Sequence, residues 1–115
     1  MVYKPELDFK LARRRGALSQ ADCAHMLGTD QPRISKFERG KAQPSTVESV
    51  LLAALFGEAL DRRSMTVIAE QQDELLERLR TIPDCPSTWR DPQRRFRTLA
   101  SFAEFLSDLN PERYV

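Results

Sequence analysis

The sequence predicts an all-α protein with a small N-terminal domain, residues 1–57, and a C-terminal segment of two helices, residues 58–115. Apolar residues recur at helical spacings of three and four along most of the chain. Serine, aspartate, glycine and proline stand where helices of this length should begin and end. The 115 residues have room for one domain, or for one small domain and an oligomerisation segment.

Composition restricts the class of protein. Hydrophobic residues make up 41% of the chain and charged residues 30%, which suits a soluble globular protein. We expect no membrane span, because no run of about 20 apolar residues occurs, and no signal peptide. Two cysteines, Cys23 and Cys85, make neither a disulfide framework nor a zinc site. We therefore expect a cytoplasmic protein with no metal and no cofactor.

Basic residues are concentrated in the N-terminal half, although the formal net charge is only +1. Between residues 4 and 41, nine lysines and arginines stand against five acids. From residue 64 onward, seven arginines stand against nine acids. This asymmetry favours nucleic acid as the partner of the N-terminal half.

The first helix is expected over Glu6–Arg15, after a loose arm at Met1–Pro5. Its basic last turn, followed by Gly16, agrees with the negative charge at the helix C-terminus. Three apolar side chains should face inward: Leu7, Phe9 and Leu11.

Two short helices joined by a glycine turn are expected between Ser19 and Pro44. Ser19 should cap the first of them, and Gly28 should end it in a left-handed conformation. Thr29 or Asp30 should cap the second, which tolerates Pro32 because that proline lies in the first turn.

The pattern across these two helices is specific. Ala24 is a small residue at their crossing, Gly28 lies in the turn, and Ile34 is an apolar plug from the second helix. With the following Glu38-Arg39-Gly40 and a proline, the stretch resembles the phage repressor/Cro-like (XRE) helix-turn-helix family over about residues 9–57. The resemblance implies a lambda-repressor-like fold. It also implies an ion pair between Arg13 and the glutamate of the E-x-G motif, Glu38.

The resemblance further implies that the second of these helices enters the major groove of double-stranded DNA. Gln31 is the first choice for a base contact, because its amide can pair bidentately with adenine, and Lys36 can donate to guanine. The other predicted base-contacting residues are Pro32, Arg33 and Ser35.

Phosphate contacts are expected from the edge of this surface. The predicted residues are Gln20, Arg39, Lys41 and Gln43. Ordinary surface charge is the alternative for Arg39 and Lys41. His25 should face away from this surface and lie exposed to solvent.

The next helix should begin at the capping box Ser45–Glu48 and stop at Gly57. Residues 50–56 are apolar almost all round the helix, more than one buried face requires. We expect this excess to be buried against the C-terminal segment or against a partner subunit.

Residues 58–64 either continue that helix or form a hinge. Apolar spacings of three and four predict a helix over Met65–Ile82, with a short strand at its start as the alternative. Three prolines then predict a loop that carries Trp89, before a last helix over about Gln93–Leu109. Its inward residues should be Phe96, Leu99, Phe102, Ala103, Leu106 and Leu109. A solvated face is expected for Arg90, Arg94, Arg95 and Arg97, with flanking DNA or an acidic partner as the alternatives.

These patterns predict a homodimeric, sequence-specific repressor that binds a palindromic operator. The residues expected to form the dimer are Leu51, Leu55, Ile68, Leu75, Leu79, Phe102 and Leu106. The alternative is an antitoxin-type regulator whose C-terminal half masks a partner protein. An enzyme is not expected, because there is one histidine, no glycine-rich phosphate loop, and no base near the serines and cysteines.

Overall fold

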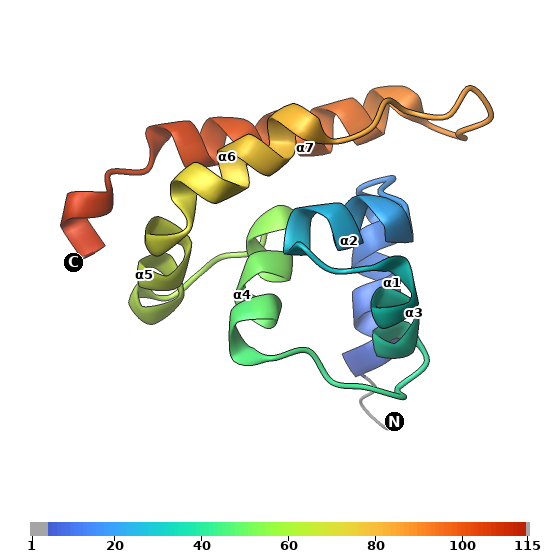
Figure 1. Cartoon of the computed structure of the whole chain (residues 1–115), viewed down its shortest axis with the longest axis horizontal. Coiled ribbons are helices and arrows are strands. Elements are labelled where there is room, and N and C mark those ends of the chain that lie inside the picture. Colours follow the sequence, from blue (N-terminus) through green and yellow to red (C-terminus); the bar gives the residue numbers. More distant parts are fainter. Residues whose placement is uncertain (1–4, 115) are drawn as a thin grey trace.

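A computed structural model describes residues 5–114, and all regular structure in that range is helical (Figure 1). The α-helices are α1 (Pro5–Arg15), α2 (Gln20–Leu27), α3 (Gln31–Glu38), α4 (Thr46–Leu55), α5 (Arg62–Glu70), α6 (Gln72–Thr81) and α7 (Pro92–Asp108), and a short 3-10 helix covers Pro111–Tyr114. The predicted all-α class is confirmed. The predicted arm lies outside the described residues except for Pro5, and so does the side chain of Leu7. Within the described range, no helix is long and apolar enough to cross a bilayer.

Local capping explains where α2 begins and ends and where α3 begins. The Ser19 hydroxyl accepts a hydrogen bond from the Asp22 N–H, and the Asp22 carboxylate accepts one from the Ser19 N–H, both at 2.9 Å. Gly28 ends α2 with φ +70°, in the left-handed region. Asp30, rather than Thr29, caps α3 by accepting from the Arg33 N–H at 3.0 Å.

The predicted helix over residues 65–82 is two helices. The backbone leaves the helical conformation at Gln71, where φ is −112° and ψ is 12°. The break lets α5 pack against α4 while α6 packs against α2 and α7. The Gln72 amide fixes the start of α6 by donating to the carbonyls of Leu106 and Leu109 at 2.6 and 2.9 Å. The alternative of a short strand near residue 65 is wrong, because α5 covers those residues.

The two halves of the chain share one hydrophobic core. Six of the side chains expected to form a dimer are buried inside this single chain: Leu51, Leu55, Ile68, Leu75, Phe102 and Leu106. Leu79 is partly buried against the same cluster. The excess apolar surface of α4 is therefore covered by the C-terminal helices α5 and α7 of its own chain.

Two apolar side chains expected to face inward are exposed. Phe9 occupies the inward face of α1 and packs edge-on against Phe37 and Phe56, with ring centroids 6.3 and 5.6 Å apart. Leu11, two residues further round the helix, is 57% exposed. On α7, Phe96 is 70% exposed. Its neighbour Arg95 takes the inward position instead, because it reaches a buried acid on α2.

Candidate nucleic-acid interface

The outward face of α3 is polar and accessible. α3 packs on α1 and α2, and it lies at the opposite end of the view from α5 (Figure 1). Ile34 and Phe37 are buried beneath it. Gln31, Pro32 and Lys36 are exposed, and Ser35 is half-buried. The helix is therefore fixed by its apolar side, and three of the five predicted base-contacting residues are exposed on its other side.

A chain of hydrogen bonds joins this face to the start of α2. Gln31 Nε2 donates to Gln20 Oε1 at 3.3 Å, and Gln20 Nε2 donates to Glu38 Oε1 at 3.1 Å. The structure thus places a predicted base-contacting residue in direct contact with a predicted phosphate-contacting residue.

Glu38 is held from behind by Arg13. Arg13 Nε donates to Glu38 Oε2 at 2.5 Å, and Arg13 Nη2 donates to Oε1 at 2.9 Å. A third bond runs from Arg13 Nη1 to the Leu18 carbonyl at 2.9 Å. Burial disfavours the Glu38 carboxylate, but hydrogen bonds from Arg13 and Gln20 outweigh it and hold its pKa below the usual value. The predicted Arg13–Glu38 pair is confirmed.

Unlike the other predicted base-contacting residues, Arg33 is paired with a residue of α4. Its guanidinium donates to both carboxylate oxygens of Glu48 at 2.8 and 2.7 Å, and it lies 4.9 Å from the centre of the Phe37 ring. The bond from Arg33, together with the capping bonds of Ser45, lowers the pKa of Glu48 to about 2 despite partial burial. This arrangement separates Arg33 from the other predicted base-contacting residues, because a base contact would require breaking the bidentate pair.

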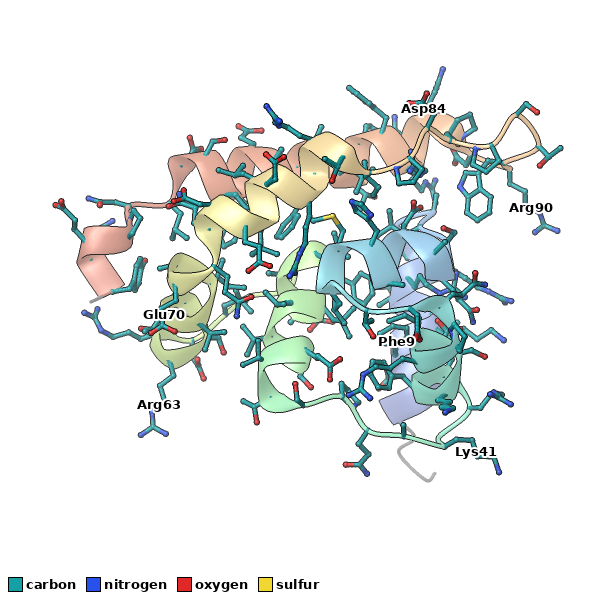
Figure 2. All side chains as sticks on the ribbon, viewed as in Figure 1. Phe9, Lys41, Arg63, Glu70, Asp84 and Arg90 are labelled. Carbon is teal, nitrogen blue, oxygen red and sulfur yellow. The ribbon has the colours of Figure 1, made fainter. Side chains whose placement is uncertain are left out.

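The predicted phosphate-contacting residues after α3 are exposed. Arg39, Lys41 and Gln43 lie in the connection to α4. The Arg39 side chain makes one long hydrogen bond, 3.4 Å, to the Ser35 carbonyl. Figure 2 shows Lys41 at the edge of the molecule, pointing away from the protein.

The comparison with protein families agrees with this geometry. Residues 9–62 match a family model described as helix-turn-helix. Residues 9–62 are a helix-turn-helix domain. The match supports a DNA-binding transcriptional regulator of the repressor/Cro-like type. No similar curated protein and no similar solved structure was found.

A buried ion pair that was not among the predictions from the sequence joins the helix-turn-helix domain to the C-terminal helices. Arg95 of α7 donates to both Asp22 oxygens at 2.9 and 2.8 Å, and also to the Pro83 carbonyl at 2.9 Å. Burial disfavours the Asp22 carboxylate, yet hydrogen bonds from Arg95 and Ser19 outweigh it and lower its pKa. The expected solvated position of Arg95 is therefore wrong.

The spacing of the last helix contained the signal for this pair. Arg95 stands four residues before Leu99 and seven before Phe102, so it lies on the same stripe as the buried face of α7. A charged residue on an apolar stripe needs a buried partner. Asp22, inside the apolar stripe of α2, is that partner.

His25 is also drawn into the contact between the two halves. Its Nε2 lies 2.8 Å from the Arg78 carbonyl oxygen and 3.1 Å from the Thr81 hydroxyl. The Arg78 guanidinium in turn donates to the Met26 carbonyl at 2.9 Å. The prediction that His25 lies on the open surface is therefore wrong, because α6 packs directly on this side of α2.

We expect acid to destabilise the helix-turn-helix domain through these carboxylates. Asp22, Glu38 and Glu48 have lowered pKa values in the folded protein. Their contribution to stability is complete above their unfolded pKa values, about 4, and is lost as pH falls through the folded values. Urea unfolding should show a much lower free energy of unfolding at pH 3 than at pH 7. In Glu48→Gln that loss should be smaller by about 1–2 kcal/mol, a figure reduced for the solvent that reaches Arg33. An equal loss in wild type and Glu48→Gln would contradict the assignment.

Proposed function

We propose that this protein is a sequence-specific repressor of its own or a neighbouring promoter. The observation that supports this most directly is the outward face of α3, where Gln31 and Lys36 are exposed while Ile34 and Phe37 fix the helix to the core. Such a helix can enter the major groove and read base edges. Repression would follow from steric exclusion of polymerase at an overlapping promoter.

We further propose that the repressor is a cytoplasmic homodimer that binds an inverted repeat. One α3 reads only a half-site, so two copies related by a two-fold axis would bind half-sites about 10–10.5 base pairs apart. Six of the seven side chains first expected to form the dimer are already buried inside one chain, and the seventh, Leu79, is partly buried. The dimer we propose therefore uses exposed residues of the C-terminal half. Sedimentation at DNA-binding concentrations tests this, and a monomer would contradict it.

Variants of single residues should distinguish base contacts from phosphate contacts. Gln31→Ala or Lys36→Ala should relax specificity at one position of each half-site, by about 1–3 kcal/mol, because each removes one base-edge contact. Lys41→Ala is the matched control, since loss of a phosphate contact should weaken all sequences alike and reduce the salt dependence. Selection from a random duplex pool, followed by anisotropy on single-base variants, measures both. A uniform loss for Gln31→Ala would contradict its assignment.

Binding to its own upstream DNA tests the proposed function as a whole. Fluorescence anisotropy would compare that DNA with a scrambled duplex at two salt concentrations. Tight binding to the upstream DNA that survives competition would support autoregulation. Weak binding that is equal on both duplexes and disappears with salt would contradict it.

The antitoxin-type alternative has one observation in its favour. Phe96 on α7 is 70% exposed, and a large exposed aromatic side chain is common at the centre of protein interfaces. A stable complex with the product of an adjacent gene, weakened by Phe96→Ala, would favour this alternative over a self-sufficient repressor.

A further inference from the structure

A basic cleft lies beside the N-terminal end of α2, between the helix-turn-helix domain and a segment of the C-terminal half. The cleft has a volume of about 940 Å³ and is formed by the end of α1, the turn before α2 and the segment 88–94. Its charged and aromatic lining residues are Arg13, Arg14, Trp89, Arg90, Asp91 and Arg94. The C-terminal half thus contributes most of one wall.

The positive charge of this cleft is not neutralised within the described part of the chain. Arg13 is already paired with Glu38, and Arg94 lies 3.4 Å from Asp91. Arg14 and Arg90 are exposed and form no ion pair with another described residue. Three cationic side chains, which we call the Arg90 patch (Arg14, Arg90 and Arg94), therefore face a single acid.

The loop that carries Arg90 is held in place by its neighbour. The Trp89 indole N–H donates to the Ala17 carbonyl at 2.7 Å. Ala17 has φ +58°, a left-handed conformation in the turn just before the cap of α2. This bond fixes the segment 88–90 to the turn that leads into Gln20. The Arg90 patch therefore adjoins the end of α2 where phosphate contacts are expected.

The Arg90 patch and the outward face of α3 are connected along the surface through the start of α2. Gln31 contacts Gln20 at the start of α2, and Trp89 contacts the turn that precedes it. Figure 2 shows Arg90 and Lys41 at the upper and lower parts of the same edge, with Arg63 on the opposite side of the view. A duplex lying along α3 would extend past Gln20 toward Arg90.

We propose that the Arg90 patch binds the phosphate backbone of duplex DNA flanking the half-site read by α3. This inference rests on the proposed function for the position of the duplex. Arginine donates to phosphate oxygens bidentately, and such contacts add affinity and fix register without reading bases. An acidic protein offers the same charge, but continuity with α3 and Gln20 favours DNA. The C-terminal half thereby lengthens the DNA contact beyond the helix-turn-helix domain.

The test uses the full-length chain and a duplex selected by the wild type from a random pool, with and without flanking base pairs. In Arg90→Ala/Arg94→Ala, two phosphate contacts are lost, so the salt dependence of binding to the flanked duplex should decrease by about 0.9 per contact. The wild-type advantage over this variant should then shrink about tenfold between 50 and 200 mM salt. Hydroxyl-radical footprinting should show loss of protection outside the half-site only, with unchanged sequence preference.

Arg63→Ala/Arg113→Ala is the matched control, because both arginines are exposed and distant from the patch. Arg63 lies on the opposite side of the view in Figure 2, and Arg113 belongs to the 3-10 helix that packs on α5. It should leave both the salt dependence and the footprint as in wild type. An Arg90→Ala/Arg94→Ala variant with wild-type salt dependence, or a control with the same loss, would overturn the proposal. If the wild type selects no sequence, the proposed repressor function fails. In that case, a lower salt dependence of the variant than of the wild type on a random-sequence duplex of the same length would still support phosphate binding by the patch.

Discussion

Replacing Arg95 with methionine should lower the free energy of unfolding by about 3–5 kcal/mol, because it leaves the buried Asp22 carboxylate without its cationic partner. The pair is bidentate, and both side chains are under 10% exposed. Asp22 would keep only the hydrogen bonds of the α2 capping box with Ser19. Methionine fills a similar volume, so the loss would report the charge and its hydrogen bonds rather than a cavity.

Arg97→Met is the control for this prediction. Arg97 is exposed two residues further along α7, and its replacement should change stability by less than about 0.5 kcal/mol. Urea denaturation followed by circular dichroism at pH 7 measures both variants. Equal effects for Arg95→Met and Arg97→Met would mean that the buried pair does not hold α7 against α2.

Local signals carried most of what the sequence could predict. Ser19, Gly28 and Ser45 determine helix ends through bonds to their own neighbours, so their roles are readable without knowing the rest of the fold. The Arg13–Glu38 pair was predictable for a different reason, because the resemblance of residues 9–57 supplied the long-range partner. Where neither source applied, the expectations were less accurate.

The C-terminal half shows why apolar periodicity alone does not predict which surface covers a helix. A stripe of apolar residues on α6 and α7 indicates that something covers it, but not whether the cover is a second subunit or the same chain. Here the cover is α2 and α4 of the same chain. The break at Gln71 has the same origin, since it depends on where α5 and α6 find partners rather than on a glycine or proline.

In the candidate site as well, local sequence patterns predicted some positions, whereas contacts between distant residues could not be predicted. Periodicity was sufficient to place Gln31 and Lys36 on the outward face of α3. It could not show that Arg33 would turn toward Glu48, because that glutamate belongs to the next helix and also caps it. The neighbourhood of Trp89 and Ala17, 72 residues apart, likewise exists only in the folded chain.

The Arg13–Glu38 pair should be about as important to stability as the Arg95 pair, and it also bears on DNA binding. Arg13→Met should cost about 3–5 kcal/mol, because the Glu38 side chain is only 3% exposed and would retain a single donor, Gln20. Replacing both partners, in Arg13→Met/Glu38→Leu, should recover much of that loss, since well-packed apolar residues can substitute for a buried pair.

DNA binding should not recover in the same way. In the double variant, the Gln20 amide has lost the carboxylate that orients it, and Gln20 in turn contacts Gln31. We therefore expect the double variant to be nearly as stable as wild type, yet to bind the selected duplex several-fold more weakly. Urea unfolding and anisotropy on the same preparations measure the two properties. If Arg13→Met is as stable as wild type, the pair does not support α3. If the double variant binds DNA normally, Glu38 does not act through Gln20.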